Sequence, residues 1–212
     1  MTMLKGIAAA ALVLGPTFAF AATPGYLDGY YIADSKLKLE GSGASADDNG
    51  DGFGLRVRAP IGDAVFVVAE YQTATVDNFA GGGFDVDIDQ IRAGLGYMFG
   101  EPQLRFGGVA EYVHLKLDAG GGDDLKPDGY GLHGRVEFAP ISAATLYTQL
   151  GYVHVSDHGT ADGFEWQIGA AYNFTPMFGA FVDYRATDLD ADDVDYKLND
   201  VRLGLRWNFG VM

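Results

Sequence analysis

The chain contains no cysteine, which excludes disulfide bonds, thiol nucleophiles and thiolate metal sites. Positive charge is scarce, because 14 lysines and arginines face 29 aspartates and glutamates and the net charge is −15. So acidic a chain does not fit nucleic-acid binding, which requires positive groups that neutralise phosphates. Long apolar runs are missing too. After residue 21, no segment approaches the roughly 18 apolar residues of a membrane-spanning helix.

The first 21 residues have the composition of a secretory signal peptide. Lys5 supplies a positive start, residues 7–14 form a short apolar core, and Ala19-Phe20-Ala21 offers a cleavage site of the small-x-small type. We therefore predict a signal peptide at 1–21 and one mature domain at 22–212. A retained membrane anchor is the alternative, but the apolar run is short for that role. Removal of Lys5 takes the net charge from −15 to −16.

The mature chain alternates apolar and polar residues, as the side chains of a half-buried β-strand do. In the last such segment the apolar residues are Val201, Leu203, Leu205, Trp207 and Phe209. Ten segments are predicted as strands: 25–39, 53–59, 64–76, 89–99, 104–117, 130–139, 145–155, 164–174, 178–187 and 198–209. No other segment of the mature chain could cover the apolar faces of these ten strands, so the pattern predicts an all-β fold. We expect a single closed antiparallel transmembrane β-barrel that is apolar outside and polar inside.

The connections between the predicted strands fall into two classes. Four are short and contain a proline, namely Pro60, Pro102, Pro140 or Pro176. Five are longer and rich in glycine and aspartate: 40–52, 77–88, 118–129, 156–163 and 188–197. We interpret these as short periplasmic turns and longer acidic extracellular loops. Apolar residues change face at 113–117 and at 86–88, which indicates either a bulge or the end of the lipid-embedded zone.

Charged residues on the inward faces are nearly balanced, with eight arginines against seven carboxylates. The predicted lumen charge network comprises Arg56, Arg92, Arg105, Arg135, Arg202, Glu70, Glu111 and Glu137. Guanidinium and carboxylate groups confined in a narrow barrel would pair with one another. The pattern favours a structural salt-bridge plug, and a narrow, gated or ion-selective pore is the alternative.

The loops hold most of the acidic residues, since 19 of the 29 lie in or beside the five long connections. Asp47-x-Asn49-x-Asp51-Gly52 matches the first half of an EF-hand loop, but Arg58 stands where the loop requires glutamate. The weak metal candidates are Asp47, Asp51, Asp188, Asp190 and Asp192. We expect no dedicated cofactor, and either solvated loops or weak calcium or magnesium binding.

Two histidines and a serine cluster near one outer loop. His154, Ser156, Asp157 and His158 lie close in sequence, with Glu165 beyond them. A serine activated by a histidine and an acid could hydrolyse an ester or an amide. The cluster keeps an outer-membrane hydrolase as a less favoured hypothesis.

Residues 87–97 (DIDQIRAGLGY) and 129–136 (GYGLHGRV) resemble a family of small outer-membrane barrels from xanthomonad-type γ-proteobacteria. The name of that family ties it to diffusible-signal-factor regulation. The resemblance covers most of the mature chain in layout, implies the barrel fold, and implies no catalytic residue. Ten-stranded outer-membrane proteases share the predicted strand number, but their Asp-x-His pair has no counterpart here.

We therefore expect a non-enzymatic outer-membrane protein of a Gram-negative bacterium, exported through the periplasm, that displays acidic surface loops. Adhesion, envelope stability and environmental response are the roles considered, and a narrow porin-like channel for small solutes or ions is the alternative. The expected partners are the lipid bilayer, lipopolysaccharide, periplasmic chaperones and the barrel-assembly machinery. The sequence does not predict an oligomeric state.

Overall fold

The computed structural model describes residues 25–41, 44–120, 124–157, 159–191 and 194–209. The predicted signal peptide lies outside these residues. Ten strands are present: β1 (Gly25–Gly41), β2 (Ala44–Pro60), β3 (Val65–Val76), β4 (Val86–Glu101), β5 (Leu104–Asp118), β6 (Asp128–Ile141), β7 (Ala144–Ser156), β8 (Thr160–Asn173), β9 (Phe178–Ala191) and β10 (Val194–Phe209).

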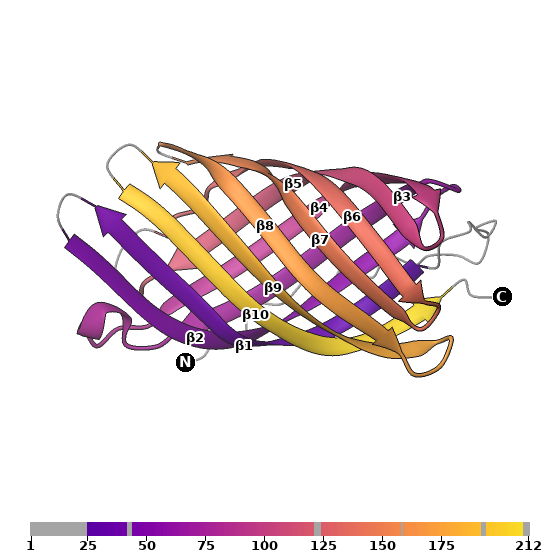
Figure 1. Ribbon diagram of the computed structural model, residues 1–212. Coiled ribbons are helices and arrows are strands. Elements are labelled where there is room, and N and C mark those ends of the chain that lie inside the picture. Colours follow the sequence, from indigo (N-terminus) through magenta and orange to yellow (C-terminus); the bar gives the residue numbers. More distant parts are fainter. Residues whose placement is uncertain (1–24, 42–43, 121–123, 158, 192–193, 210–212) are drawn as a thin grey trace, which may run out of the picture.

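Every strand pairs antiparallel with its neighbours in sequence, and β1 closes the sheet by pairing with β10. This last pairing runs from Gly25 opposite Phe209 to Gly41 opposite Val194. The result is a tilted, closed barrel with no free strand edge (Figure 1). The predicted closed antiparallel barrel of ten strands is therefore confirmed.

The middle of the barrel is apolar on the outside and polar on the inside. Outward residues such as Leu55, Leu95, Leu150 and Leu205 are more than half exposed. Many inward residues are buried and charged, among them Asp28, Glu70, Arg92, Asp183 and Arg202. Because water does not surround the outer face of a membrane barrel, exposed leucines mark the lipid-facing zone. Phe99, Phe138 and Phe174 stand at the end with the short turns, as an interfacial aromatic girdle does.

The strands extend farther at the other end than the sequence predicted. Most of 40–52, 156–163 and 188–197 is strand rather than loop, and β1–β2, β7–β8 and β9–β10 are closed by short connections. The predicted boundaries were wrong there because glycine and aspartate were taken as loop signals. Cross-strand pairing overrides the weak strand preference of these residues. The connection between β5 and β6 was predicted at 118–129 and lies between Asp118 and Asp128.

Above the lipid-facing zone, apolar side chains lie on the inward face of the barrel and charged side chains on the outward face. Val113, Leu115 and Leu117 stay on the inward face of β5, because the β4–β5 and β5–β6 registers contain no shift. The predicted bulge in 104–117 is therefore wrong. The alternative explanation, that this segment lies past the lipid, fits the outward lysines and aspartates of the same zone.

A bulge does occur in β1, between Ile32 and Ser35. It inserts one extra residue, so Ile32 and Leu37 both face the interior although an odd number of positions separates them. Lys36 and Lys38 consequently point outward. The bulge places β1 in the same pattern as the other strands, with apolar residues inside the outer end.

The β3–β4 connection contains a short 3-10 helix, η1 (Phe79–Gly81). Phe79 is buried and packs against Leu37 and Ile88 inside the barrel. The carboxylate of Asp48 accepts a hydrogen bond from the backbone amide of Ala80 at 2.7 Å, which ties this connection to β2. Among the described residues, no helix is long and apolar enough to cross a membrane.

Candidate functional site

The barrel interior contains a network of buried ion pairs that joins strands on opposite sides of the lumen. Arg202 on β10 donates to Glu70 on β3 at 2.8 Å and to Asp183 on β9 at 2.6 Å. Arg185 on β9 reaches the second oxygen of Glu70 at 2.9 Å. Because β3 is not a neighbour of β9 or β10, these bonds cross the lumen rather than follow the sheet.

Both central carboxylates are saturated with donors. Glu70 also accepts from the hydroxyl of Tyr30 at 2.8 Å, and Asp183 accepts from Tyr147 and Gln167, each at 2.8 Å. Charges removed from water are stable only when their hydrogen-bonding capacity is filled in this way.

The network continues toward both ends of the barrel. Toward the short turns, Arg56 joins Asp183 to Asp28, and Arg206 donates to Asp28 at 2.7 Å. Toward the outer end, Arg92 on β4 donates at 2.7 Å to Glu111 on β5 and also binds Glu165 on β8. The structure thus brings Arg56, Arg92, Arg202, Glu70 and Glu111 into one lumen assembly.

The remaining predicted lumen residues lie nearer the short turns. Glu137 on β6 accepts from Arg135 at 2.8 Å and from Arg58 on β2 at 2.6 Å. Arg105 is partly exposed and lines a polar chamber of about 550 Å³ together with Glu137 and Arg206. It does not belong to the central assembly.

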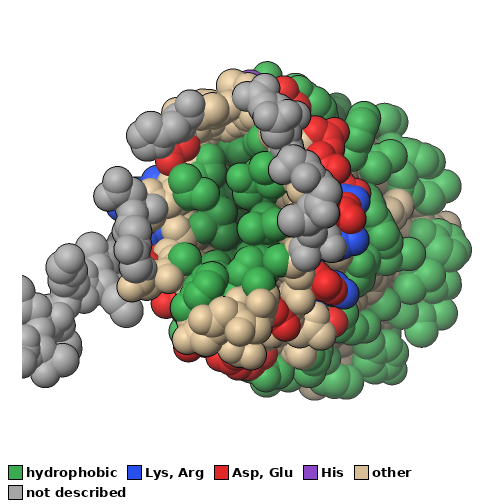
Figure 2. All heavy atoms as spheres, turned by 90° about the vertical axis from the view of Figure 1, so that its left-hand side faces the viewer, with side chains coloured by type: hydrophobic (Ala, Val, Ile, Leu, Met, Phe, Trp, Pro, Cys, Tyr) green, Lys and Arg blue, Asp and Glu red, His purple; other side chains and the backbone are tan. Residues whose placement is uncertain are grey.

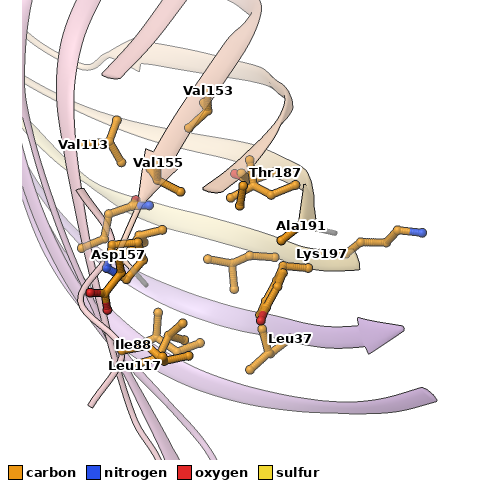
Figure 3. A pocket seen from close by; sticks show the side chains of 18 of the residues that line it. Leu37, Ile88, Val113, Leu117, Val153, Val155, Asp157, Thr187, Ala191 and Lys197 are labelled. Carbon is orange, nitrogen blue, oxygen red and sulfur yellow. The ribbon is translucent and has the colours of Figure 1, made fainter. Parts of the chain in front are cut away.

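A second chamber, of about 200 Å³, occupies the outer end of the barrel (Figure 3). We call it the outer chamber. Its walls are mainly aliphatic and come from six strands and the β5–β6 connection: Leu37, Ile88, Val113, Leu115, Leu117, Leu125, Val153, Val155, Leu189 and Leu198. Gln90, Arg92 and Thr187 contribute polar groups. Arg185, Arg202, Glu70 and Asp183 separate it from the polar chamber, and each is at most 6% exposed.

The outer end carries a ring of charged side chains around this apolar interior. Figure 2 looks into this end and shows hydrophobic side chains in the mouth with acidic side chains around it. Lys126 and Lys197 fall within two of the long connections predicted from the sequence, 118–129 and 188–197. Because the strands are longer than predicted, Lys36, Lys38 and Lys116 join them there.

Lysines neutralise part of the acidic ring. Lys36 pairs with Asp47 at 2.7 Å, and this contact lowers the pKa of the aspartate. Glu40 accepts from Lys197 and from Lys38, each at 2.7 Å, and these two hydrogen bonds lower its pKa to about 2. Neither carboxylate is free to act as an unpaired metal ligand.

The other weak metal candidates do not converge. Asp51 accepts from Tyr31, while Asp188 and Asp190 are exposed on the outer face of β9. Asp192 lies outside the described residues. Among the described residues, only Glu111, His133 and Glu165 bring three ligand atoms within 4.8 Å of one another. The guanidinium of Arg92 already binds both of these glutamates, so a cation would compete with a fixed positive charge.

The predicted hydrolase cluster is split between two faces of the barrel. His154 contacts Asp162 through Nδ1, and its ring lies beside Tyr130, on the outward face. Glu165 faces the lumen and binds Arg92, so the expectation that it lies beside this cluster is wrong. The carboxylate of Asp157 accepts a hydrogen bond from the backbone amide of Lys126. His158 lies outside the described residues.

The outer chamber is the part of the interior that sequence reasoning missed. The sequence signal for this chamber was the change of face of the apolar residues at 113–117 and 86–88, which was interpreted as either a bulge or the end of the lipid-embedded zone and not as an internal chamber. The uncharged partners of the ion pairs, such as Tyr30 and Gln72, were missed as well. Their inward positions follow from strand alternation, but their pairing across the lumen follows only from barrel closure.

Residues 7–209 match the family model of the outer membrane protein beta-barrel domain. The chain belongs to this family. Together with the closed barrel, this membership assigns the protein to the bacterial outer membrane. Cleavage of the signal peptide and the narrower resemblance to xanthomonad-type barrels stay predictions. No curated protein matches the sequence.

Solved structures of several outer-membrane barrels are similar. The outer membrane protease OmpT from Escherichia coli is 11% identical with a TM-score of 0.66, over 91% of this chain and 99% of that one. The translocator domain of the autotransporter NalP from Neisseria meningitidis is 12% identical with a TM-score of 0.52, over 93% of this chain and 91% of that one. At these identities the likeness shows the fold alone, and the protease activity of OmpT is not carried over.

Proposed function

We propose that this protein is a non-enzymatic outer-membrane barrel with a closed lumen, whose acidic outer end stabilises the cell envelope. Of the three roles that the sequence suggested, adhesion and environmental response would require a partner-specific surface. Envelope stability requires only charges at the level of the lipopolysaccharide. The observation that carries the proposal is a row of carboxylates on the outward face of the strands.

The row crosses three strands at one height. Asp162 on β8 lies opposite Asp190 on β9, and Asp190 lies opposite Asp195 on β10. Glu40 on β1 follows opposite Asp195, but it is already paired with Lys38 and Lys197. Like charges directly opposite one another destabilise a sheet. A shared calcium or magnesium ion relieves this repulsion by oxygen ligation. Because these carboxylates point outward from the barrel wall, the same ions would also bridge to phosphates of neighbouring lipopolysaccharide.

The envelope role is tested in cells with the double variant Asp190→Asn/Asp195→Asn. We expect these cells to admit a hydrophobic dye more readily than cells with the native barrel, at equal amounts of folded protein in the membrane. The control is Asp47→Asn/Asp51→Asn, whose carboxylates already pair with Lys36 and Tyr31. Equal dye entry in both variants and the native strain would contradict the proposal.

The lumen network supports a closed barrel, and planar-bilayer recording tests it. Among the described residues, the two chambers are separated by buried, mutually paired side chains, which opposes the passage of hydrated ions. We expect no conductance steps from the refolded protein. Regular steps of one size would instead support the alternative, a narrow porin-like channel.

The non-enzymatic assignment rests on the division of the hydrolase cluster between the lumen and the outer face. The His154–Asp162 contact is the observation that still favours a hydrolase. Hydrolysis of a lipid ester by the refolded protein, abolished by Ser156→Ala, would overturn the assignment. We further propose that the protein reaches the membrane through periplasmic chaperones and the barrel-assembly machinery, as its fold requires export before insertion.

A further inference from the structure

We infer that the outer chamber binds a small uncharged molecule with a hydrocarbon body and one oxygen acceptor. This goes beyond the proposed envelope role and holds whether or not the barrel conducts ions. Three features carry the inference: the apolar wall, an unpartnered donor at the floor, and the negative charge around the mouth.

The wall commits many aliphatic side chains to an interior that is not completely filled. Val113, Val153 and Val155 are at most 1% exposed and form one cluster with Leu189, while Leu37, Ile88 and Phe79 form a second one. The chamber lies between these clusters and opens toward the outer end, where hydrophobic side chains are visible in the mouth (Figure 2). Concave apolar surface with a few polar groups is typical of a small-molecule site.

The volume limits the size of the ligand. A cavity of about 150 Å³ lined by aliphatic and aromatic side chains holds benzene, which has six heavy atoms. The outer chamber, at about 200 Å³, therefore has room for about eight heavy atoms on the same scale. A complete lipid is excluded, but a short chain or a single ring fits.

The floor selects an acceptor rather than a donor or an acid. The two terminal nitrogens of Arg92 are taken by Glu111 and Glu165, but its Nε is buried and has no hydrogen-bond partner among the described residues. A carbonyl or hydroxyl oxygen would satisfy this N–H group. A carboxylate would approach Glu111 and Glu165 at the same time, which opposes its entry.

The mouth adds to the same selection. Asp157 and Lys197 lie on opposite sides of the chamber lining in Figure 3. Beyond them, the carboxylates of the outer end give the approach a negative potential, which lowers the local concentration of anions. The ligand class is therefore neutral, as for a short ketone, alcohol or ester.

The test uses 2-heptanone, which has eight heavy atoms, against heptanoate, which has the same hydrocarbon chain length but carries a negative charge at pH 7. The refolded barrel is placed in lipid nanodiscs, with labelled valine methyl groups and labelled arginine side chains. We expect 2-heptanone to shift the methyl signals of Val113 and Val153 saturably and to shift the Nε–H signal of Arg92. We expect heptanoate to bind at least about tenfold more weakly, since like-charge contacts cost more than the 1.4 kcal/mol of one tenfold step.

Ala161→Phe should abolish these shifts, because residue 161 on β8 lines the chamber and a phenyl ring fills it. Ala170→Phe is the matched control, since Ala170 lies on the outward face of the same strand and should leave binding unchanged. Different migration of boiled and unboiled samples verifies that each variant has folded. Absence of saturable shifts in the native barrel would show that the chamber is only the dry core of the outer end. Equal or tighter binding of heptanoate, or binding that survives Ala161→Phe, would also overturn the inference.

Discussion

Arg202 shows most directly what a single lumen residue contributes. Its side chain is fully buried and donates to both central carboxylates, Glu70 and Asp183. Arg202→Leu would leave two negative charges short of a partner inside the barrel, and removal of one member of a buried ion pair costs about 3–5 kcal/mol. We expect a loss of this order in urea unfolding. Arg105→Leu is the matched control with little expected loss, because Arg105 is outside the central assembly.

Glu40 predicts the pH dependence of the outer end. Its two lysine contacts lower its pKa from the usual 4.5 to about 2. A carboxyl group whose folded pKa is lowered contributes stability above pH 4.5, and that stability is lost as the pH falls from 4.5 toward 2. A carbon-detected NMR titration of Glu40 should therefore give a midpoint well below 4.5. Lys197→Met should raise this midpoint, and an unchanged midpoint would contradict the assigned contact.

At the scale of one element, the β1 bulge decides which side of the outer end is apolar. Deletion of Ala33 removes the extra residue and restores regular alternation, so the register rule predicts that Lys36 still points outward and Leu37 inward. The chain has no cysteine, so single cysteines at these two positions report their exposure through a charged maleimide. Lys36→Cys should react faster than Leu37→Cys in the native frame, and the same order should hold in the deletion. A reversed order in the deletion would show that β1 changes register elsewhere.

Element identity was predictable from the sequence, but the outer boundaries were not. The alternation of β10, from Val201 to Phe209, is a local property and needs no knowledge of the neighbouring strands. The strand conformation of Gly50 and Asp51 depends on pairing with β3, which local preference does not contain. For the same reason the inward charges were predictable, whereas the bond from Arg92 to Glu165 across the lumen required the closed barrel.

For the molecule as a whole, the carboxylates of the outer end predict weak and distributed calcium binding. Calorimetric titration of the refolded barrel should give dissociation constants of roughly 10⁻⁴–10⁻³ M, as in low-affinity extracellular sites. Asp190→Asn/Asp195→Asn should reduce the heat more than Asp47→Asn/Asp51→Asn, because the latter pair already has partners. No heat at millimolar calcium, or complete loss in either double variant, would refute a distributed set of ions.

The exchange of faces along the strands also fixes the height of the protein in the bilayer. If the barrel sank, outward lysines and aspartates such as Lys36 and Asp188 would enter lipid, where a charged side chain costs up to about 2–4 kcal/mol. If it rose, the exposed leucines of the middle zone would enter water. The outer end is therefore held above the lipid. A molecule that enters the outer chamber would come from the surrounding water rather than from the membrane.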